Sequence, residues 1–399
     1  MLNSLSHEQI ATITLWYLVQ HSLSSFQKLQ QHFGTSTKAV TASNLQIWPN
    51  LGLHKSHLQR VVEIQTPAGQ NKLQTLLHDV QASCDFILLD SESHYPSQLL
   101  PYADRPPILF GQGNPQSLLQ PQVAIVGSRK PSPHGKQVAY DFAYYLAEKG
   151  FYICSGLAEG IDAAAHQGGL KHQRTIAVMG TGLDLTYPSQ HQTLRTQILE
   201  NNGCIITEFL PHTPPLQHNF PRRNRIVSAL SLGVVVAEAA LKSGSLGTAK
   251  SAAEQGKTIF AIPGHIYSEH HQGCHQLIRE GAILVDHPEQ IIEDLALPTQ
   301  WHSQSQSQET TPSASIEIPS DLLELYNQLD WVGQNMDQLN FKLNIDIATL
   351  TSQLRTGDFR TRTTTGWQLS ALPFQPIRFT ITLYKSIKGT KCNDYHLCD

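Results

Sequence analysis

Short apolar runs alternate with amphipathic stretches from residue 123 to residue 297, and this alternation limits the possible fold more than any other feature of the chain. The apolar runs have the length of strands, and the stretches between them can form helices of about ten residues. Strands that alternate with helices predict an α/β fold with a doubly wound parallel sheet, which we place at residues 115–297. The runs are VAIVG, FYICSG, TIAVMGTG, CIITEF, LGVVVAEAA, TIFAIPG and GAILV.

Glycine-rich turns follow several of these predicted strands. In a doubly wound sheet, ligands bind outside the carboxyl ends of the strands. Glycine lets backbone N–H groups approach a phosphate, and a helix N-terminus adds partial positive charge. The turns therefore predict a site for a polyanionic ligand, although they could simply close tight connections. The turn residues are Gly127, Ser128, Arg129, Ser155, Gly156, Gly160, Gly180, Thr181, Gly182, Gly244, Ser245 and Thr248.

The segment QHNFPRRNRIVSAL, residues 217–230, places an aromatic ring beside several cations. Arginines at a helix N-terminus oppose the helix dipole and favour a compensating anion. Bases stack on rings while guanidinium groups contact phosphates, so the segment is typical of a site for unpaired nucleic acid. The alternative is that Phe220 packs in the core and the arginines are solvated. The candidates here are Asn219, Phe220, Arg222, Arg223, Asn224 and Arg225.

The composition excludes a protein that binds nucleic acid through its overall charge, because the net charge is −4 with neutral histidines. Any such binding must come from a local basic patch. The six cysteines form no CxxC pair, which indicates reduced thiols and a cytosolic protein. The N-terminal segment is predicted to begin a helix and not a signal peptide, and no apolar run is long enough to span a membrane.

The sequence gives little sign of catalysis. Asp162, Asp184, Glu208 and Glu238 lie near predicted strand ends and could form an acid–base pair, although Asp162 is equally well explained as a helix cap. Neither SEHHQGCH (residues 268–275) nor the C-terminal Cys and His residues have a known zinc spacing. The common nucleophile, Walker and dinucleotide motifs are absent. We expect no enzyme activity, no metal and no cofactor.

The remaining segments suggest flanking modules. Residues 1–75 have helical patterns and are predicted to form a small domain of the sterile-alpha-motif or helix-hairpin type, and residues 76–114 a connector with a short strand at each end. Residues 298–319 form a Ser/Gln-rich linker. Residues 320–399 have the outline of an incomplete winged helix with an atypical tail.

The tail after Gln353 lacks a regular apolar pattern. One hypothesis is a shifted reading frame, which would make the residues from about Leu354 onward poorly ordered and functionally unimportant. The codons of the gene, read in the shifted frame, would test it.

Several of these motifs together resemble the DNA-processing protein A family. The stretches that carry the resemblance lie in order within residues 123–294, and they are IVGSRKPSPHG, SGLAEGIDAAAHQGGL, VMGTGLDLTYPSQHQTL, the long segment ITEFLPHTPPLQHNFPRRNRIVSALSLGVVVAEAALKSGSLGTAKSAAEQGKTIFAIPG, and GCHQLIREGAILV. The resemblance implies an extended Rossmann-like sheet and a bacterial cytosolic protein of natural transformation. Such a protein binds and protects incoming single-stranded DNA, loads a RecA-type recombinase onto it, and forms a homodimer through the Rossmann-like domain.

The family's basic pocket corresponds to Arg129, Asn219, Phe220, Arg222 or Arg223, Asn224, Arg225 and Lys250. The alternative is a nucleotide-cleaving enzyme of the lysine-decarboxylase-like phosphoribohydrolase type. That group carries Pro-Gly-Gly-x-Gly-Thr-x-x-Glu at the matching turn, but here Ser251 takes the place of the glutamate, with Lys250 beside it. A hydroxyl and a cation favour holding a phosphate over cleaving a glycosidic bond.

Overall fold

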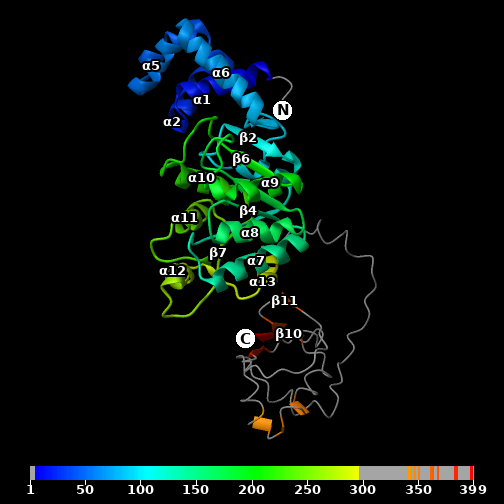
Figure 1. Ribbon diagram of the computed structural model, residues 1–399. Helices are drawn as coiled ribbons and strands as arrows, with labels where there is room; N and C mark the ends of the chain where they lie inside the picture. The colour runs from blue at the N-terminus through cyan, green and yellow to red at the C-terminus, as the bar shows by residue number, and fades with distance from the viewer. Residues whose placement is uncertain are drawn as a thin grey trace, which may run out of the picture. The chain divides into compact units, whose positions relative to one another are not determined.

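The computed structural model describes residues 5–295 and, beyond them, residues 340, 342–343, 345–346 and 349–350 and the strand segments 360–363, 366–367, 382–384 and 396–398. The chain divides into two compact units, Met1–Pro298 and Thr299–Asp399. Figure 1 shows the first unit with its blue N-terminal helices beside β2 and β6, and with α13 toward the opposite end.

A nine-stranded sheet forms the centre of the first unit, in the order β1-β2-β6-β5-β4-β3-β7-β8-β9. The strands from β6 to β9 in this order pair in parallel, which confirms the predicted α/β fold. The strands are β1 Phe86–Leu89, β2 Ile108–Gly113, β3 Gln122–Gly127, β4 Tyr152–Ser155, β5 Thr175–Val178, β6 Cys204–Thr207, β7 Gly233–Glu238, β8 Thr258–Ala261 and β9 Ile283–Leu284.

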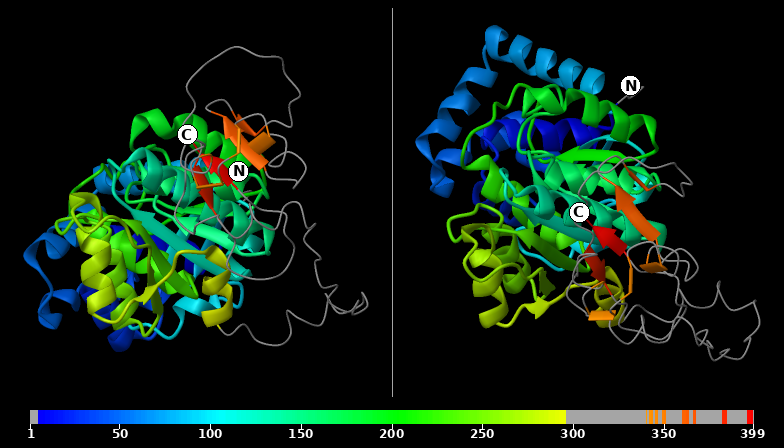
Figure 2. Two further views of the ribbon diagram at one scale, coloured as in Figure 1. Left: turned by 90° about the horizontal axis from the view of Figure 1, so that it is seen from below. Right: turned by 60° about the horizontal axis from the view of Figure 1, so that its bottom comes forward.

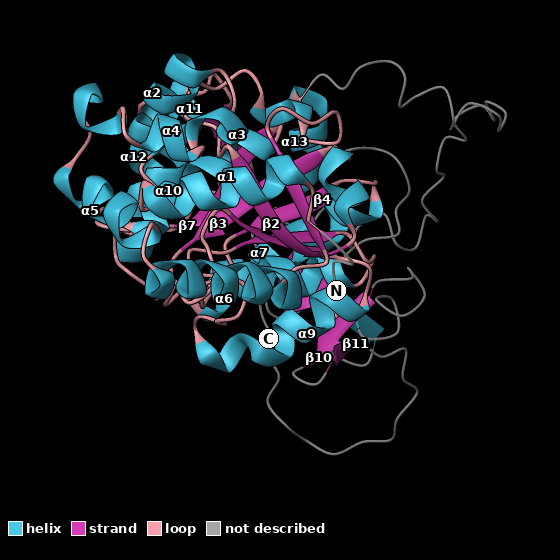
Figure 3. Cartoon of the chain, turned by 90° about the horizontal axis from the view of Figure 1, so that it is seen from above, coloured by secondary structure: helices cyan, strands magenta, loops and turns pink. Residues whose placement is uncertain are grey.

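Helices cover both faces of the sheet (Figure 3). Alternate residues of β3 point to opposite faces of the sheet and belong to two different hydrophobic clusters. Val123 and Ile125 pack with α7, α8 and α13, whereas Ala124 and Val126 pack with α10, α11 and α12. Both faces of a parallel strand are therefore buried, as its continuous apolar sequence requires. The helices are α7 Pro133–Glu148, α8 Ile161–Leu170, α9 Gln192–Glu200, α10 Asn219–Leu230, α11 Leu246–Glu254, α12 Gln272–Arg279 and α13 Pro288–Asp294.

The winding direction of the sheet reverses at β3. From β3 the chain adds β4, β5 and β6 on one side, and it then returns to add β7, β8 and β9 on the other. Such a reversal opens a crevice at the carboxyl ends of the central strands, where ligands of this fold class bind.

The helical N-terminal segment packs directly on the β1 end of the sheet. Its residues Ile13, Trp16 and Val80 share one buried cluster with Ile87 and Ile205 of the strands. Gly34 ends α2 with φ +84°, a backbone conformation that favours glycine. The elements are α1 His7–Leu18, α2 Leu23–Phe33, α3 Ser36–Ala39, α4 Ala42–Leu45, η1 Trp48–Leu51, α5 Lys55–Ile64 and α6 Pro67–Ser83.

The predicted boundary between the helical segment and the connector needs correction. The helical segment does not end at residue 75, because α6 continues to Ser83; its first turns are polar, and the buried Leu77 and Val80 come later. The predicted connector, residues 76–114, does contain a strand near each end, but β1 and β2 also extend the sheet by antiparallel pairing with each other and with β6.

Side chains occupy part of the outer edge of β1. Gln9 Nε2 donates to the carbonyl of Ile87 at 3.5 Å, and the backbone N–H of Leu89 donates to the Glu92 carboxylate at 3.1 Å. The opposite edge strand, β9, exposes Ile283 and Leu284. Figure 2 brings this end of the unit, with yellow α12 and α13, toward the viewer.

Short 3₁₀ turns complete the first unit, namely η2 Ser97–Leu99, η3 Pro115–Leu119, η4 Ser189–His191 and η5 Glu269–His271.

In the second unit the strands pair in the order β11-β10-β13-β12, and they are β10 Arg360–Thr363, β11 Gly366–Trp367, β12 Thr382–Tyr384 and β13 His396–Cys398. The predicted linker, residues 298–319, and most of the predicted winged helix lie outside the described residues. Within the described part of the chain, no helix is both long and apolar enough to cross a membrane.

Candidate nucleic-acid interface

A cavity of about 1050 Å³ opens at the carboxyl ends of β3, β4 and β7, where the winding reverses. Its lining comes from the turns after β3 and β4, the loop after β5, one face of α10 with the residues just before it, and the loop between β7 and α11 with the first turn of that helix. Ten of the predicted site residues line it, namely Gly127, Ser128, Arg129, Gly156, Phe220, Arg223, Asn224, Gly244, Ser245 and Thr248.

The turn after β3 is held by β7. The backbone N–H of Ser128 donates to the Glu238 carbonyl at 2.7 Å, and the buried Glu238 carboxylate accepts from both the N–H and the hydroxyl of Ser132. Gly127 is required, because a Cβ there would lie 2.6 Å from Ile161 and 2.7 Å from the Glu238 carbonyl. The turn is therefore fixed, while Arg129 at its tip is exposed.

Arg129 lies over an aromatic ring in the cavity. Its guanidinium carbon is 5.3 Å from the centre of the Phe220 ring, within the range of a cation–π contact. The half-buried Phe220 ring rests on the backbone at Gly180, and the exposed Tyr187 ring lies 5.6 Å away. This arrangement offers a cation that can pair with an anion and two adjacent rings on which a planar group can stack.

Arg223 is a buried cation beneath this surface. Its guanidinium donates to the carbonyls of Gly156 and Val178, which joins the ends of β4 and β5. Asp162 accepts from the Gly156 N–H at 3.1 Å, and burial raises the pKa of its carboxyl although Arg223 opposes the shift. Arg223 thus shapes the floor of the cavity more than it offers a free charge.

The register of α10 explains which of its residues line the cavity. Phe220, Arg223, Asn224 and Val227 follow the spacing i, i+3, i+4, i+7 and share the cavity face. Arg222 and Arg225, three residues apart, share another face and both pair with Glu208. The geometry therefore places these two predicted arginines outside the cavity, because a helix cannot present three nearly consecutive arginines to one side.

The other predicted residues, including those of the Gly180–Gly182 turn, do not line the cavity. Ser155 is buried and donates its hydroxyl to the Ile125 carbonyl, and Asn219 is buried and donates to the Pro214 carbonyl. Gly160, with φ +79°, packs under the β3 turn, where its lack of a Cβ permits close contact with the Ser128 carbonyl. Lys250 is exposed, lies 3.9 Å from Glu254, and belongs to a separate groove.

The sequence prediction missed several lining residues. Lys130 and Lys242 are exposed cations on two of the cavity loops, and Tyr187 and Gln217 line it as well. Tyr187 had a sequence signal, because it closely follows the Gly180–Gly182 turn; the two lysines had none beyond their loop positions.

The chain was compared with known proteins. The family model described as "DNA recombination-mediator protein A" matches residues 86–296, more than half of the chain. The chain belongs to this family. The predicted resemblance is thereby confirmed, and the match covers every segment that builds the cavity.

Individual proteins also resemble this chain in sequence and in structure. Protein Smf of Escherichia coli (strain K12) is 43% identical over 259 residues, which are 62% of this chain and 69% of that protein. The DNA processing protein DprA of Streptococcus pneumoniae is 42% identical over 220 residues, or 55% of this chain and 77% of that one. The X-ray structure of DprA from Streptococcus pneumoniae, 32% identical, covers 74% of this chain and 100% of that chain with a TM-score of 0.63.

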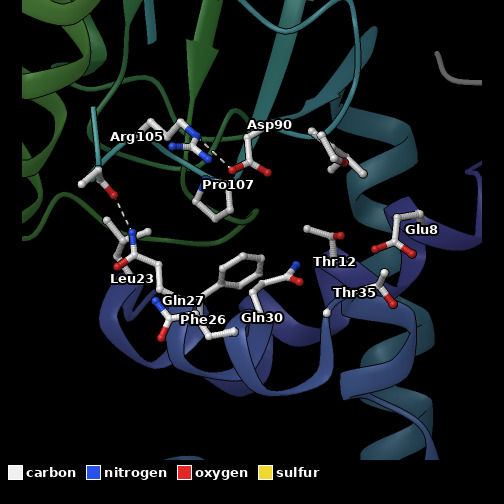
Figure 4. A pocket seen from close by; sticks show the side chains of 15 residues that line it. Glu8, Thr12, Leu23, Phe26, Gln27, Gln30, Thr35, Asp90, Arg105 and Pro107 are labelled. Atoms are coloured by element: carbon white, nitrogen blue, oxygen red, sulfur yellow. Dashed lines mark hydrogen bonds and ion pairs between the residues drawn. The ribbon is translucent and has the colours of Figure 1, made fainter. Parts of the chain in front are cut away.

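This family member has a second cavity, of about 710 Å³, between α1 and α2 and the segment that joins β1 and β2 (Figure 4). Several of its polar lining groups already bond to one another or to nearby groups: Arg105 pairs with Asp90, Gln27 donates to the Ala103 carbonyl, and Gln30 donates to Ser36. These groups are less available to a ligand than the exposed Arg129 and Tyr187 of the first cavity.

Proposed function

We propose that this chain binds single-stranded DNA in the carboxyl-end cavity, protects it, and delivers it to a RecA-type recombinase during natural transformation. Membership of the family places the chain in DNA processing. The observation that carries the finer proposal is the contact of Arg129 with Phe220, next to the exposed Tyr187. Stacking on rings with a nearby guanidinium suits unpaired bases of any sequence.

A binding titration tests the choice of ligand. The full chain is titrated with an unstructured single strand and with the corresponding duplex, each at two salt concentrations. We expect tighter binding of the single strand at both concentrations, because paired bases cannot stack on Phe220 and Tyr187. Equal affinity for the two forms at the same salt would overturn the proposal.

Self-association through the Rossmann-like domain is part of the proposal. The edge strand β9 exposes Ile283 and Leu284, and a groove of about 540 Å³ beside it is lined by apolar residues that include Ile259 and Leu277. Exposed apolar side chains on an unpaired edge strand favour pairing with a second copy.

We also propose that the protein acts without catalysis in the cytosol. Ser251 stands where the phosphoribohydrolases carry their glutamate, and Asp162, an acid that lines the cavity, is buried and bonded to backbone. Cys84, Cys154, Cys204 and Cys274 are free and buried, which suits a reducing compartment. Release of free base from nucleoside monophosphates would contradict the first part of this proposal.

A further inference from the structure

The carboxylate of Glu208, at the end of β6, is completely buried and paired with α10. Arg225 donates to both of its oxygens, at 2.9 and 2.8 Å, and Arg222 lies 3.3 Å from one of them. Buried ion pairs with several well-directed bonds fix orientation more than they add stability. Glu208 therefore fixes the rotation and position of α10.

The N-terminal helices bond to the same cluster. The buried Trp16 indole donates to the backbone carbonyl of Glu208 at 2.8 Å, and Arg222 donates to the His21 carbonyl at 2.8 Å. The His21 ring accepts from the Leu210 N–H at 3.3 Å, and burial lowers the pKa of His21 to about 3, so the ring stays neutral and can accept. The segment before residue 22 thus holds both the end of β6 and α10.

The opposite face of α10 forms part of the DNA cavity. Arg222 and Arg225 face Glu208, while Phe220 and Arg223 line the cavity. Because a helix moves as a rigid unit over such a short length, a shift on the Glu208 side moves the stacking ring.

A second contact from the N-terminal helices reaches the other ring. Asp79, on α6, accepts from the His212 ring at 2.9 Å, and the same ring lies 2.9 Å from Asp184. Asp184 precedes Tyr187 by three residues and also accepts from the His212 backbone N–H. Both rings of the cavity therefore lie on segments that the N-terminal helices hold.

We infer that the helical segment, residues 5–83, positions the DNA cavity, and that Trp16 is a positioning residue that acts through Glu208 and α10 on Phe220. The inference rests on the proposed single-stranded DNA binding. It assigns the segment a role in affinity without contact between Trp16 and DNA.

The test compares two tryptophans. Trp16→Phe removes the hydrogen bond to Glu208, and Trp48→Phe removes a similar buried bond, from the Trp48 indole to the Ala39 carbonyl within the helical segment. Binding of a labelled oligo-dT of about 20 nucleotides is measured at a temperature where both variants are folded. We expect Trp16→Phe to weaken binding about fivefold, the equivalent of one hydrogen bond, and Trp48→Phe to leave it unchanged.

A double-mutant cycle separates positioning from general destabilisation. In a Phe220→Ala background, Trp16→Phe should cause no further loss of affinity, because the ring that it positions is gone. The inference would be overturned if Trp16→Phe and Trp48→Phe weakened oligo-dT binding equally. It would also be overturned if Trp16→Phe weakened binding as much in the Phe220→Ala background as in the wild-type background.

Two other outcomes are also informative. If the wild-type protein does not bind oligo-dT, the proposed function fails and the inference fails with it. If Trp16→Phe does not fold, Asp79→Ala replaces it, since it removes only surface contacts, to His212 and to the neighbouring His78. That variant should weaken binding in the wild-type background but not in a Tyr187→Ala background, and a loss of equal size in both would contradict the inference.

Discussion

At the scale of single residues, the cavity combines charge and stacking in two neighbouring side chains. Arg129 is exposed and Phe220 is half-buried, with the guanidinium 5.3 Å from the ring centre. The two side chains should therefore contribute to DNA binding through different physics, and replacing each by alanine separates the contributions.

Arg129→Ala should weaken single-stranded DNA binding and reduce the slope of log K against log salt by about one unit. The reason is the loss of one phosphate contact and of the counterion that it releases. A salt titration of oligo-dT binding measures this. Lys171→Ala, which removes an exposed charge that does not line the cavity, is the control and should keep the wild-type slope. An unchanged slope for Arg129→Ala would place the phosphate contact elsewhere.

Phe220→Ala should cost about 1–3 kcal/mol of binding free energy and leave the salt slope nearly unchanged, because stacking involves no ion release. The variant should stay folded, since the ring borders an open cavity. Phe151→Ala, which truncates a buried core ring, is the contrast and should cost about 3–5 kcal/mol of stability. A Phe220 variant that melts as early as the Phe151 variant would show that the ring is a core residue.

The sequence predicted this site at the level of segments better than at the level of side chains. It identified the β3 turn, α10 and the α11 turn, because glycines, an aromatic residue and arginines mark them. It could not divide the arginines between two helix faces, since the exact start of α10 determines which face each one occupies. Nor could it show that the partner of Arg222 and Arg225 is Glu208, which comes from another strand end.

At the scale of elements, β9 is short, exposed and apolar. Leu284→Lys should convert the proposed dimer into a monomer, because a charge on an edge strand opposes pairing with a second copy. Sedimentation of the full chain at micromolar concentration measures the change. Leu241→Lys, at an exposed leucine in the loop between β7 and α11, should keep the wild-type oligomeric state. If the wild-type protein sediments as a dimer and the Leu284→Lys protein sediments identically, this edge is excluded as the interface.

The strands between residues 123 and 285 were predictable because short apolar runs alternate there regularly with helical stretches. The extension of the sheet by β1 and β2 was not, because two short strands on either side of a polar loop do not indicate their partners. The packing of the helical segment against the sheet could not be predicted either. Trp16 and Glu208, which form one of its contacts, are separated by 192 positions, and the sequence does not pair residues so far apart.

At the scale of the whole molecule, buried neutral histidines make stability depend on pH. Burial lowers the pKa of His21 and of His166 to about 3, from an ordinary value of 6.5. Below pH 6.5 the unfolded chain binds protons that the folded chain does not, so stability falls as the pH decreases toward 3. Each histidine contributes a slope of up to about 1.4 kcal/mol per pH unit.

Denaturant unfolding between pH 7.5 and pH 5 should therefore show a declining free energy of unfolding, with a smaller decline in His166→Gln. The pKa of the largely exposed His212 is raised by Asp79 and Asp184, so its contribution has the opposite sign and is lost as the pH rises through that pKa. A decline that is as large in His166→Gln as in the wild-type protein would contradict the neutral state of the buried His166 ring.

The two ends of the nine-stranded sheet differ, and this has a consequence for assembly. At β1, Gln9 and Glu92 bond to backbone groups of the strand, whereas β9 is exposed. A sheet with two free edges can add copies without limit and grow into a fibre. Here, pairing of β9 with β9 of a second copy would use the open edge of both copies, so the assembly would stop growing at two chains.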